Sequence, residues 1–201
     1  MSATSPRVSS GPMPRVVLVR HGETEWSAAG RHTGRTDVPL TEEGLRQAKA
    51  LGACLEGFSF ALVLTSPLQR ARETCRLARL EAVAQIRDDL MEWDYGEYEG
   101  RTTPDIRTTR PGWSLWDEGV PGGETAGQVG RRADRVIAEA RSARGDVALF
   151  AHGHILRTLT ARWVGLPPDR GRSFALETAT ISVLGYERET PVIQRWNLPC
   201  G

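Results

Sequence analysis

Long hydrophobic runs and a surplus of charge of either sign are both missing from this chain of 201 residues. No apolar stretch approaches the roughly 20 residues that a membrane-spanning helix needs, so no membrane partner is expected. Lysine and arginine together number 26 against 25 acidic residues, which leaves no basic field to attract nucleic acid. The composition therefore argues against partners of either kind.

Cysteine is also scarce. Cys54, Cys75 and Cys200 form no CxxC pair, are odd in number and stand beside no histidine. This usage predicts reduced thiols in a cytoplasmic protein, with Cys54 and Cys75 in the core. It argues against a cysteine nucleophile and against a zinc site.

The N-terminus lacks the apolar core of a signal peptide. Residues 1–14 are rich in Ser, Pro and Gly and are expected to be a disordered tail. Residues 15–201 show no internal repeat and are numerous enough for one substantial core, so they are predicted to form a single domain.

Apolar runs of strand length alternate with segments of helical periodicity. Helices are expected over 129–140 and 155–163, after Thr41, and from Ser66-Pro67, with Ser66 as the N-cap. Segment 92–123 has no strong period, and a loop of that length is usually functional. The alternation predicts an α/β fold, a three-layer sandwich with a largely parallel sheet flanked by helices. The expected strands, the last two forming a hairpin, cover 16–19, 61–64, 83–87, 147–150, 180–186 and 191–196.

The chain has only four histidines, and all lie in or near two clusters, Arg20-His21-Gly22 and His152-Gly153-His154. Each cluster directly follows an apolar strand, at the sheet edge where open α/β folds bind ligands. Arginine offers a charged planar donor fork that suits phosphate, and histidine offers a nitrogen nucleophile near neutral pH. Gly22 is expected to let the backbone come close to a ligand.

Further motifs stand in the same order on the expected elements. The chain resembles the histidine phosphatase superfamily, in the branch that includes cofactor-dependent phosphoglycerate mutases and related phosphatases. The resemblance extends from Val16 to Gly185 and implies the phosphoglycerate mutase-like fold. It rests on Arg20-His21-Gly22-Glu23-Thr24-Glu25-Trp26, Thr33-Gly34, Ser66-Pro67-Leu68-Gln69-Arg70-Ala71, Glu92-Trp93-Asp94-Tyr95-Gly96 with Glu99-Gly100, and His152-Gly153.

The resemblance implies catalytic roles for five residues. His21 would attack phosphorus and become a transient phosphohistidine. Arg20, Arg70 and His152, which would be cationic when phosphate is bound, would hold the negative oxygens of the transferring phosphoryl group. Glu92, starting protonated, would donate a proton to the leaving alkoxide and then take one from the attacking water. No metal and no cofactor are implied.

Other residues are candidates for substrate binding. Contacts to the phosphate or its ester oxygen are expected from Ser27, Thr33, Gly34 and Gly153, although many family members carry Asn where this chain has Ser27. Trp93, with Trp113 and Trp116, is expected to form a wall on the substrate side. For His32 and His154, contact with substrate and a purely structural role both remain open.

The choice between phosphatase and mutase depends on the segment after Glu92. Mutases of this branch carry a longer insertion there with a basic pair, whereas Arg101–Gly123 is short and holds only isolated arginines. Hydrolysis of small organic phosphate monoesters is therefore favoured, as in a subgroup of broad acid phosphatases and sugar-bisphosphatases. The alternatives are a cofactor-dependent phosphoglycerate mutase and, more remotely, a non-catalytic phosphate-binding module. The physiological substrate and a homodimeric state both remain open.

Overall fold

Strand β1 (Val16–Arg20) lies inside a six-stranded sheet with the order β3-β2-β4-β1-β5-β6. The four strands from β3 to β1 are parallel, β5 runs antiparallel to β1, and β6 runs antiparallel to β5, so that β5 and β6 form the expected hairpin. The computed structural model describes residues 13–200, so the predicted disordered tail, 1–14, falls almost wholly outside the described residues. The other strands are β2 (Phe60–Thr65), β3 (Ala84–Ile86), β4 (Asp146–Ala151), β5 (Thr180–Glu187) and β6 (Thr190–Pro199).

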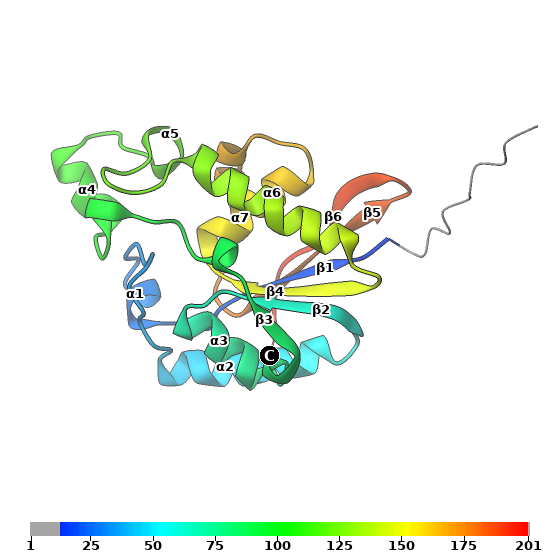
Figure 1. The fold of residues 1–201 in the computed structure, drawn as a ribbon. Helices are drawn as coiled ribbons and strands as arrows, with labels where there is room; N and C mark the ends of the chain where they lie inside the picture. Colours follow the sequence, from blue (N-terminus) through cyan, green and yellow to red (C-terminus); the bar gives the residue numbers. More distant parts are fainter. Residues whose placement is uncertain (1–12, 201) are drawn as a thin grey trace, which may run out of the picture.

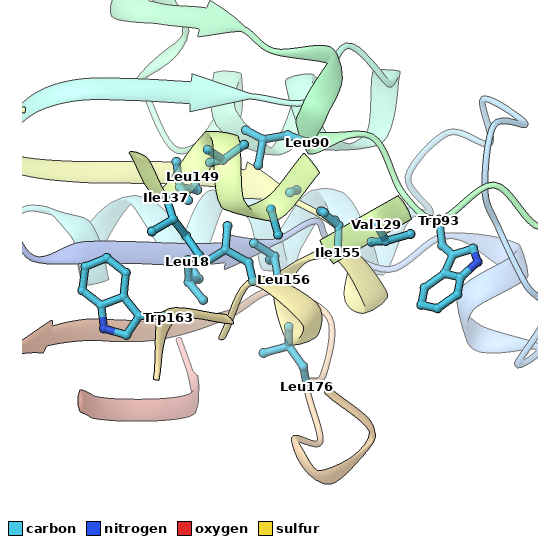
Figure 2. Packing of buried hydrophobic residues seen from close by; sticks show 14 of the residues in the cluster. Leu18, Leu90, Trp93, Val129, Ile137, Leu149, Ile155, Leu156, Trp163 and Leu176 are labelled. Atoms are coloured by element: carbon cyan, nitrogen blue, oxygen red, sulfur yellow. The ribbon is translucent and has the colours of Figure 1, made fainter. Parts of the chain in front are cut away.

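Helices cover both faces of the sheet, which confirms the three-layer prediction (Figure 1). Helices α2 (Glu42–Leu55) and α3 (Gln69–Leu77) lie on one face, and α6 (Ala126–Ser142) and α7 (Gly153–Trp163) lie on the other. Side chains of β1 alternate between the two layers: Val16 and Leu18 join one apolar cluster, and Val17 and Val19 join the other. Figure 2 shows the first cluster, with Trp93 at its end.

Short helices occupy the segments where the sequence indicated only loops. In place of one structureless stretch over 92–123, the chain forms two short helices and one 3-10 turn, and one of the helices starts at a Thr102–Asp105 capping box. Figure 1 shows α1 and α4 beyond the same end of the sheet, and a bridge joins Arg31, after α1, to Thr102, before α4. Within residues 13–200 the short helices are α1 (Glu25–Ala28), α4 (Thr103–Thr109) and α5 (Leu115–Glu118), with 3-10 turns at η1 (Glu81–Val83), η2 (Asp88–Leu90), η3 (Gly96–Tyr98) and η4 (Pro168–Ser173).

The start of α3 corrects the prediction from Ser66-Pro67. The helix begins at Gln69, and Leu68 is its N-cap without a side-chain hydrogen bond. The Ser66 N–H still pairs with the Phe150 carbonyl of β4, so the chain keeps an extended course past the end of β2. Arg70 therefore stands second in the helix.

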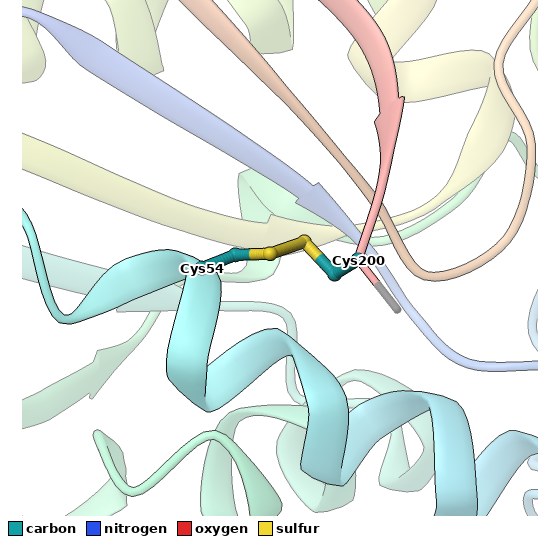
Figure 3. Close-up of a disulfide and its surroundings, with 2 residues drawn as sticks. All are labelled: Cys54 and Cys200. Carbon is teal, nitrogen blue, oxygen red and sulfur yellow. A yellow bond between two sulfur atoms is a disulfide. The ribbon is translucent and has the colours of Figure 1, made fainter.

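A disulfide joins Cys54 near the end of α2 to Cys200 after β6, which corrects the prediction of reduced thiols (Figure 3). The return course of β6 brings the two Cα atoms to 6.1 Å across 146 residues of sequence, a proximity that spacing alone does not reveal. The inference of a cytoplasmic location from reduced thiols loses its support. Cys75 is a buried free thiol, as expected, and burial raises its pKa to about 12.

No helix formed by residues 13–200 is both long and apolar enough to cross a membrane.

Candidate active site

Two neighbouring parallel strands bring the two histidine clusters together. Arg20 of β1 pairs with Ala151 of β4, and the His21 N–H donates to the Ala151 carbonyl at 3.1 Å. The His21 and His152 rings consequently lie 5.1 Å apart at the carboxyl ends of the strands. The sequence prediction that both clusters share one edge of the sheet is confirmed.

The hydrogen bonds of His21 fix its tautomer. Its Nδ1 lies 2.7 Å from the Gly22 carbonyl, which can only accept, so Nδ1 carries the proton and Nε2 keeps its lone pair. Burial, followed by the positive charges of Arg70 and Arg20, holds the pKa of His21 well below its usual range. The ring is therefore neutral and nucleophilic at Nε2.

Gly22 allows close packing against the backbone of α2, whereas the sequence predicted close approach of a ligand. A Cβ at this position would lie 2.4 Å from the Gly44 carbonyl oxygen of α2. The missing side chain thus lets the start of α2 approach the His21 loop, rather than letting a ligand approach the backbone.

The Arg70 side chain is fully buried behind His21. Its Nη atoms donate to the carbonyls of Thr33, Gly34 and Thr36, at 3.1, 2.8 and 2.9 Å, so Arg70 holds the 33–36 loop while supplying positive charge. Its Nε donates to His152 Nδ1 at 3.0 Å.

His152 is neutral in this structure, whereas the cation was expected for the phosphate-bound state. Because its Nδ1 accepts from Arg70, the ring proton sits on Nε2 and is donated to Ser66 Oγ at 2.8 Å. Burial and the Arg70 charge hold the pKa of His152 well below its usual range. Both ring nitrogens are thus engaged within the protein.

Glu92 is tied to the beginning of α7. Its carboxylate accepts backbone N–H groups from Trp93, His154 and Ile155, each at 2.9 Å. Burial by itself would raise the pKa of Glu92, but its hydrogen bonding with His154 outweighs burial and holds this pKa well below the usual range. The expected protonated acid is therefore an ionised carboxylate in this structure.

Arg20 carries an unused donor. Its Nη1 donates to the Leu176 carbonyl, while its buried Nε has no hydrogen-bond partner. In the described part of the chain, the only other buried side-chain polar atom without a partner is Thr158 Oγ1. A buried guanidinium N–H without an acceptor is costly, and an anion beside it would remove that cost.

Arg20, His21 and Glu92 border a pocket of about 180 Å³. Seven of the predicted residues line it: Arg20, His21, Ser27, Thr33, Glu92, Gly153 and His154. Arg70, His152, Gly34 and Trp93 are not among the lining residues. The further lining residues are Gly30, Arg31, His32, Tyr95, Arg157 and Leu176.

The expected tryptophan wall is not present at the pocket. Trp93 is fully buried and donates a hydrogen bond from Nε1 to the Glu124 carbonyl at 2.8 Å. Trp113 is also buried, and its Nε1 donates to the Gly119 carbonyl at 3.0 Å. The aromatic lining is instead Tyr95 with His32 and His154, whose ring centroids lie 4.7 and 5.8 Å from that of Tyr95.

Two predicted phosphate contacts are already engaged elsewhere. The Gly34 N–H donates to Glu99 Oε1 at 2.8 Å. Ser27 Oγ accepts the Thr24 N–H at 2.9 Å and completes the capping box of α1. Loop residues that bind ligands and loop residues that stabilise the loop carry the same small polar groups, so sequence could not separate them.

Arg157 and Tyr95 are the main lining residues that the sequence analysis missed. Tyr95 stands three residues after Glu92 in the same sequence motif, and this proximity was a usable signal. Arg157 stands three residues after His154 on α7, a spacing that places both on one helix face. Among residues 13–200, no group of three His, Cys, Asp or Glu side chains could hold a metal ion.

Comparison with known proteins gives a consistent picture. An acid phosphatase of Mycobacterium tuberculosis is 46% identical over 178 residues, covering 86% of this chain and 87% of the relative. A sedoheptulose 1,7-bisphosphatase of Saccharomyces cerevisiae is 38% identical over 185 residues, covering 76% of this chain and 68% of the relative. The solved structure of an open reading frame product of M. tuberculosis superposes with a TM-score of 0.88 at 42% identity, covering 94% of this chain and 99% of that one. The family model of the histidine phosphatase superfamily (branch 1) matches residues 16–199, and the chain belongs to this superfamily.

Proposed function

We propose that the protein is a phosphatase that hydrolyses small organic phosphate monoesters through a phosphohistidine at His21, without a metal or cofactor. The observation that carries this proposal is the neutral His21, whose free Nε2 lies in one pocket with the unpartnered Nε of Arg20. A nucleophile and a donor for negative oxygens are the two groups that phosphoryl transfer needs most. The relatives named as acid phosphatase and sedoheptulose 1,7-bisphosphatase support hydrolysis of small esters.

In the first step His21 Nε2 attacks phosphorus, and the bond between phosphorus and the ester oxygen breaks. Arg20 would stabilise the phosphoryl oxygens directly, while Arg70 would add positive charge from behind His21. Glu92 would give a proton to the departing alkoxide. In the second step Glu92 takes a proton from water as that water attacks phosphohistidine and the bond between phosphorus and Nε2 breaks. Inorganic phosphate then leaves with that proton, which returns Glu92 to its ionised form.

Since Glu92 is ionised in the structure, its proton would arrive with the substrate. A phosphate ester has a second pKa near about 6, so a substantial fraction is monoanionic in mildly acidic solution. The negative phosphoryl oxygens next to Glu92 would also raise the pKa of this carboxyl group, which favours transfer of that proton to Glu92.

Turnover of p-nitrophenyl phosphate in EDTA tests this proposal. Wild-type protein is expected to release nitrophenol at an undiminished rate in the chelator, whereas no turnover would contradict the proposal and favour a non-catalytic phosphate-binding module.

A second assay addresses the mutase alternative. We expect net phosphate release from several sugar phosphates and little interconversion of 2- and 3-phosphoglycerate, because the short segment after Glu92 offers no paired-arginine clamp. Efficient interconversion stimulated by 2,3-bisphosphoglycerate would establish the mutase.

A further inference from the structure

The hydrogen bond between His21 Nδ1 and the Gly22 carbonyl depends on the orientation of a single peptide group. This carbonyl belongs to the peptide that joins Gly22 to Glu23, and the N–H of the same peptide faces the opposite way because a peptide group is planar and trans. That N–H donates to Gln47 Oε1 of α2 at 3.0 Å. Among residues 13–200, both polar groups of this peptide therefore pair with side chains, His21 on one side and Gln47 on the other.

The two adjoining peptides are held by other groups. The Gly22 N–H donates to Thr74 Oγ1 of α3 at 3.1 Å, and the Glu23 carbonyl accepts the Thr41 N–H at 3.0 Å. The loop after His21 is thus fixed on either side of the peptide between Gly22 and Glu23. The orientation of that peptide is left to Gln47.

Gly22 makes an orienting contact necessary. The absence of its side chain is required by the close packing against Gly44, and the same absence lets the following peptide rotate at low cost. After such a rotation the Glu23 N–H would face His21 Nδ1, which would then have to accept a hydrogen bond. The ring proton would move to Nε2, and Nε2 would lose the lone pair that attacks phosphorus.

The Gln47 amide is itself fixed in one orientation. Its Nε2 donates to Glu43 Oε1 at 3.1 Å, so Oε1 is the atom that faces the Glu23 N–H. Gln47 stands three residues after Gly44 on α2, a spacing that places both on one helix face. One face of α2 therefore supplies both the close approach to Gly22 and the acceptor for Glu23.

We propose that Gln47 is a positioning residue that orients the peptide between Gly22 and Glu23 and thereby keeps the His21 proton on Nδ1 and the lone pair on Nε2. Gln47 is not among the residues that line the pocket, so it acts on the reaction only through His21. Its effect on the rate rests on the proposed phosphatase function, whereas its effect on the His21 tautomer does not.

Nitrogen-15 NMR of the histidine rings tests the tautomer directly, because a protonated ring nitrogen and one with a lone pair resonate far apart. The His21 signals are those absent from His21→Ala. In wild-type protein we expect the proton on Nδ1. Gln47→Lys replaces the acceptor by a donor and can still pair with Glu43, so the carbonyl of the rotated peptide should face the lysine and the proton should lie mainly on Nε2.

Kinetics give the second measurement. Gln47→Lys should lower kcat/KM for p-nitrophenyl phosphate by about 10- to 100-fold, the range for exchanging a favourable hydrogen bond to a charged group. The double variant Glu43→Gln, Gln47→Glu reverses the pair but keeps an acceptor toward the Glu23 N–H, so it should restore both the Nδ1 proton and nearly the wild-type rate. Cys54→Ser, on the same helix, is the control for lost stability and should change neither quantity.

Each outcome decides between the two proposals. A proton on Nε2 in wild-type protein would overturn the role of Gln47 even if Gln47→Lys fails to fold. An unchanged tautomer in folded Gln47→Lys would also overturn it, whatever the rate, because an added charge or a loss of stability would then explain any fall. A shifted tautomer with an undiminished rate would separate Gln47 from catalysis. If wild-type protein turns over no ester while the tautomer still follows residue 47, the phosphatase proposal fails and the orienting role of Gln47 stands.

Discussion

Arg70 Nε lies 3.0 Å from His152 Nδ1, and this single hydrogen bond sets the protonation of the ring behind His21. Because a guanidinium can only donate, His152 must accept on Nδ1 and carry its proton on Nε2, toward Ser66. The pair joins the start of α3 to the end of β4 without adding a second proton to the imidazole. His21 therefore lies near one fixed guanidinium charge from α3 and a neutral ring from β4.

Arg70→Lys tests the double role of this arginine in charge and loop support. Lysine keeps the charge but presents one nitrogen, so it cannot reach His152 and the carbonyls of the 33–36 loop together. We expect kcat/KM to fall by about 100-fold and backbone amide exchange at 33–37 to accelerate. Arg72→Lys, on the exposed side of the same helix, is the control and should change neither quantity. Full activity in Arg70→Lys would reduce its role to charge alone.

His21→Ala tests the nucleophile. Removal of Nε2 abolishes the covalent route, so kcat should fall by at least about 1,000-fold while the melting temperature stays near that of the wild type. Rapid quenching of wild-type protein with phosphorus-labelled substrate should place the label on His21 in an acid-labile bond. Substantial turnover by His21→Ala, or label on another residue, would refute the assignment.

Glu92→Gln tests the proton donor through the leaving group. Alkyl phosphates need protonation of the departing oxygen, whereas p-nitrophenolate leaves with little help. The variant should therefore lose far more kcat on an alkyl phosphate than on p-nitrophenyl phosphate. Glu97→Gln, on an exposed side chain of η3, is the control. Equal losses on both substrates would mean that Glu92 acts only by accepting backbone N–H groups.

The sequence predicted the parts of this protein that depend on local pattern. Apolar runs gave the strands, and motifs after β1 and β4 gave both histidines, because strand ends and their polar neighbours are adjacent in sequence. Contacts between distant segments were not predictable in this way. The Cys54–Cys200 bond depends on where β6 ends, and the burial of Trp93 depends on its hydrogen bond to the Glu124 carbonyl. The charge states of Glu92 and His152 likewise follow from donors in other elements.

Reduction of the Cys54–Cys200 disulfide should destabilise the fold without changing the pocket. The bond closes a long loop, and disulfides of this kind contribute about 2–4 kcal/mol to the free energy of unfolding. Cys54 is ten residues beyond Gly44 on α2, roughly 15 Å along the helix from the His21 loop. We expect dithiothreitol to lower the melting temperature by about 5–15 °C and to leave kcat at 25 °C unchanged. In a Cys54→Ser variant, the melting temperature should already be low and should no longer respond to dithiothreitol. If dithiothreitol left the melting temperature of the wild-type protein unchanged, the stabilising role of the disulfide would be refuted.

The pH dependence of kcat/KM should report the substrate rather than Glu92. The pKa of His21 lies well below 6.5, so the nucleophile stays neutral through mildly acidic solution and activity falls only at lower pH. Glu92 is ionised over the same range because its pKa is also lowered, so its titration cannot cause a loss of activity as the pH rises. That loss is expected near the second pKa of the phosphate ester, about 6, where the substrate no longer brings a proton. We expect the alkaline side of the profile to shift to higher pH for an alkyl phosphate than for p-nitrophenyl phosphate, whose second pKa is lower.

Circular dichroism at each pH is the control for this profile. The buried histidines have lowered pKa values, so the unfolded chain binds more protons than the folded one below about pH 6.5, and stability should decline as the pH falls. Loss of activity in acid therefore counts as titration of His21 only where the fold persists. An alkaline side that stays at one pH for both substrates would assign the titration to the enzyme. Such a result would require Glu92 to start protonated, against the three backbone N–H groups that it accepts.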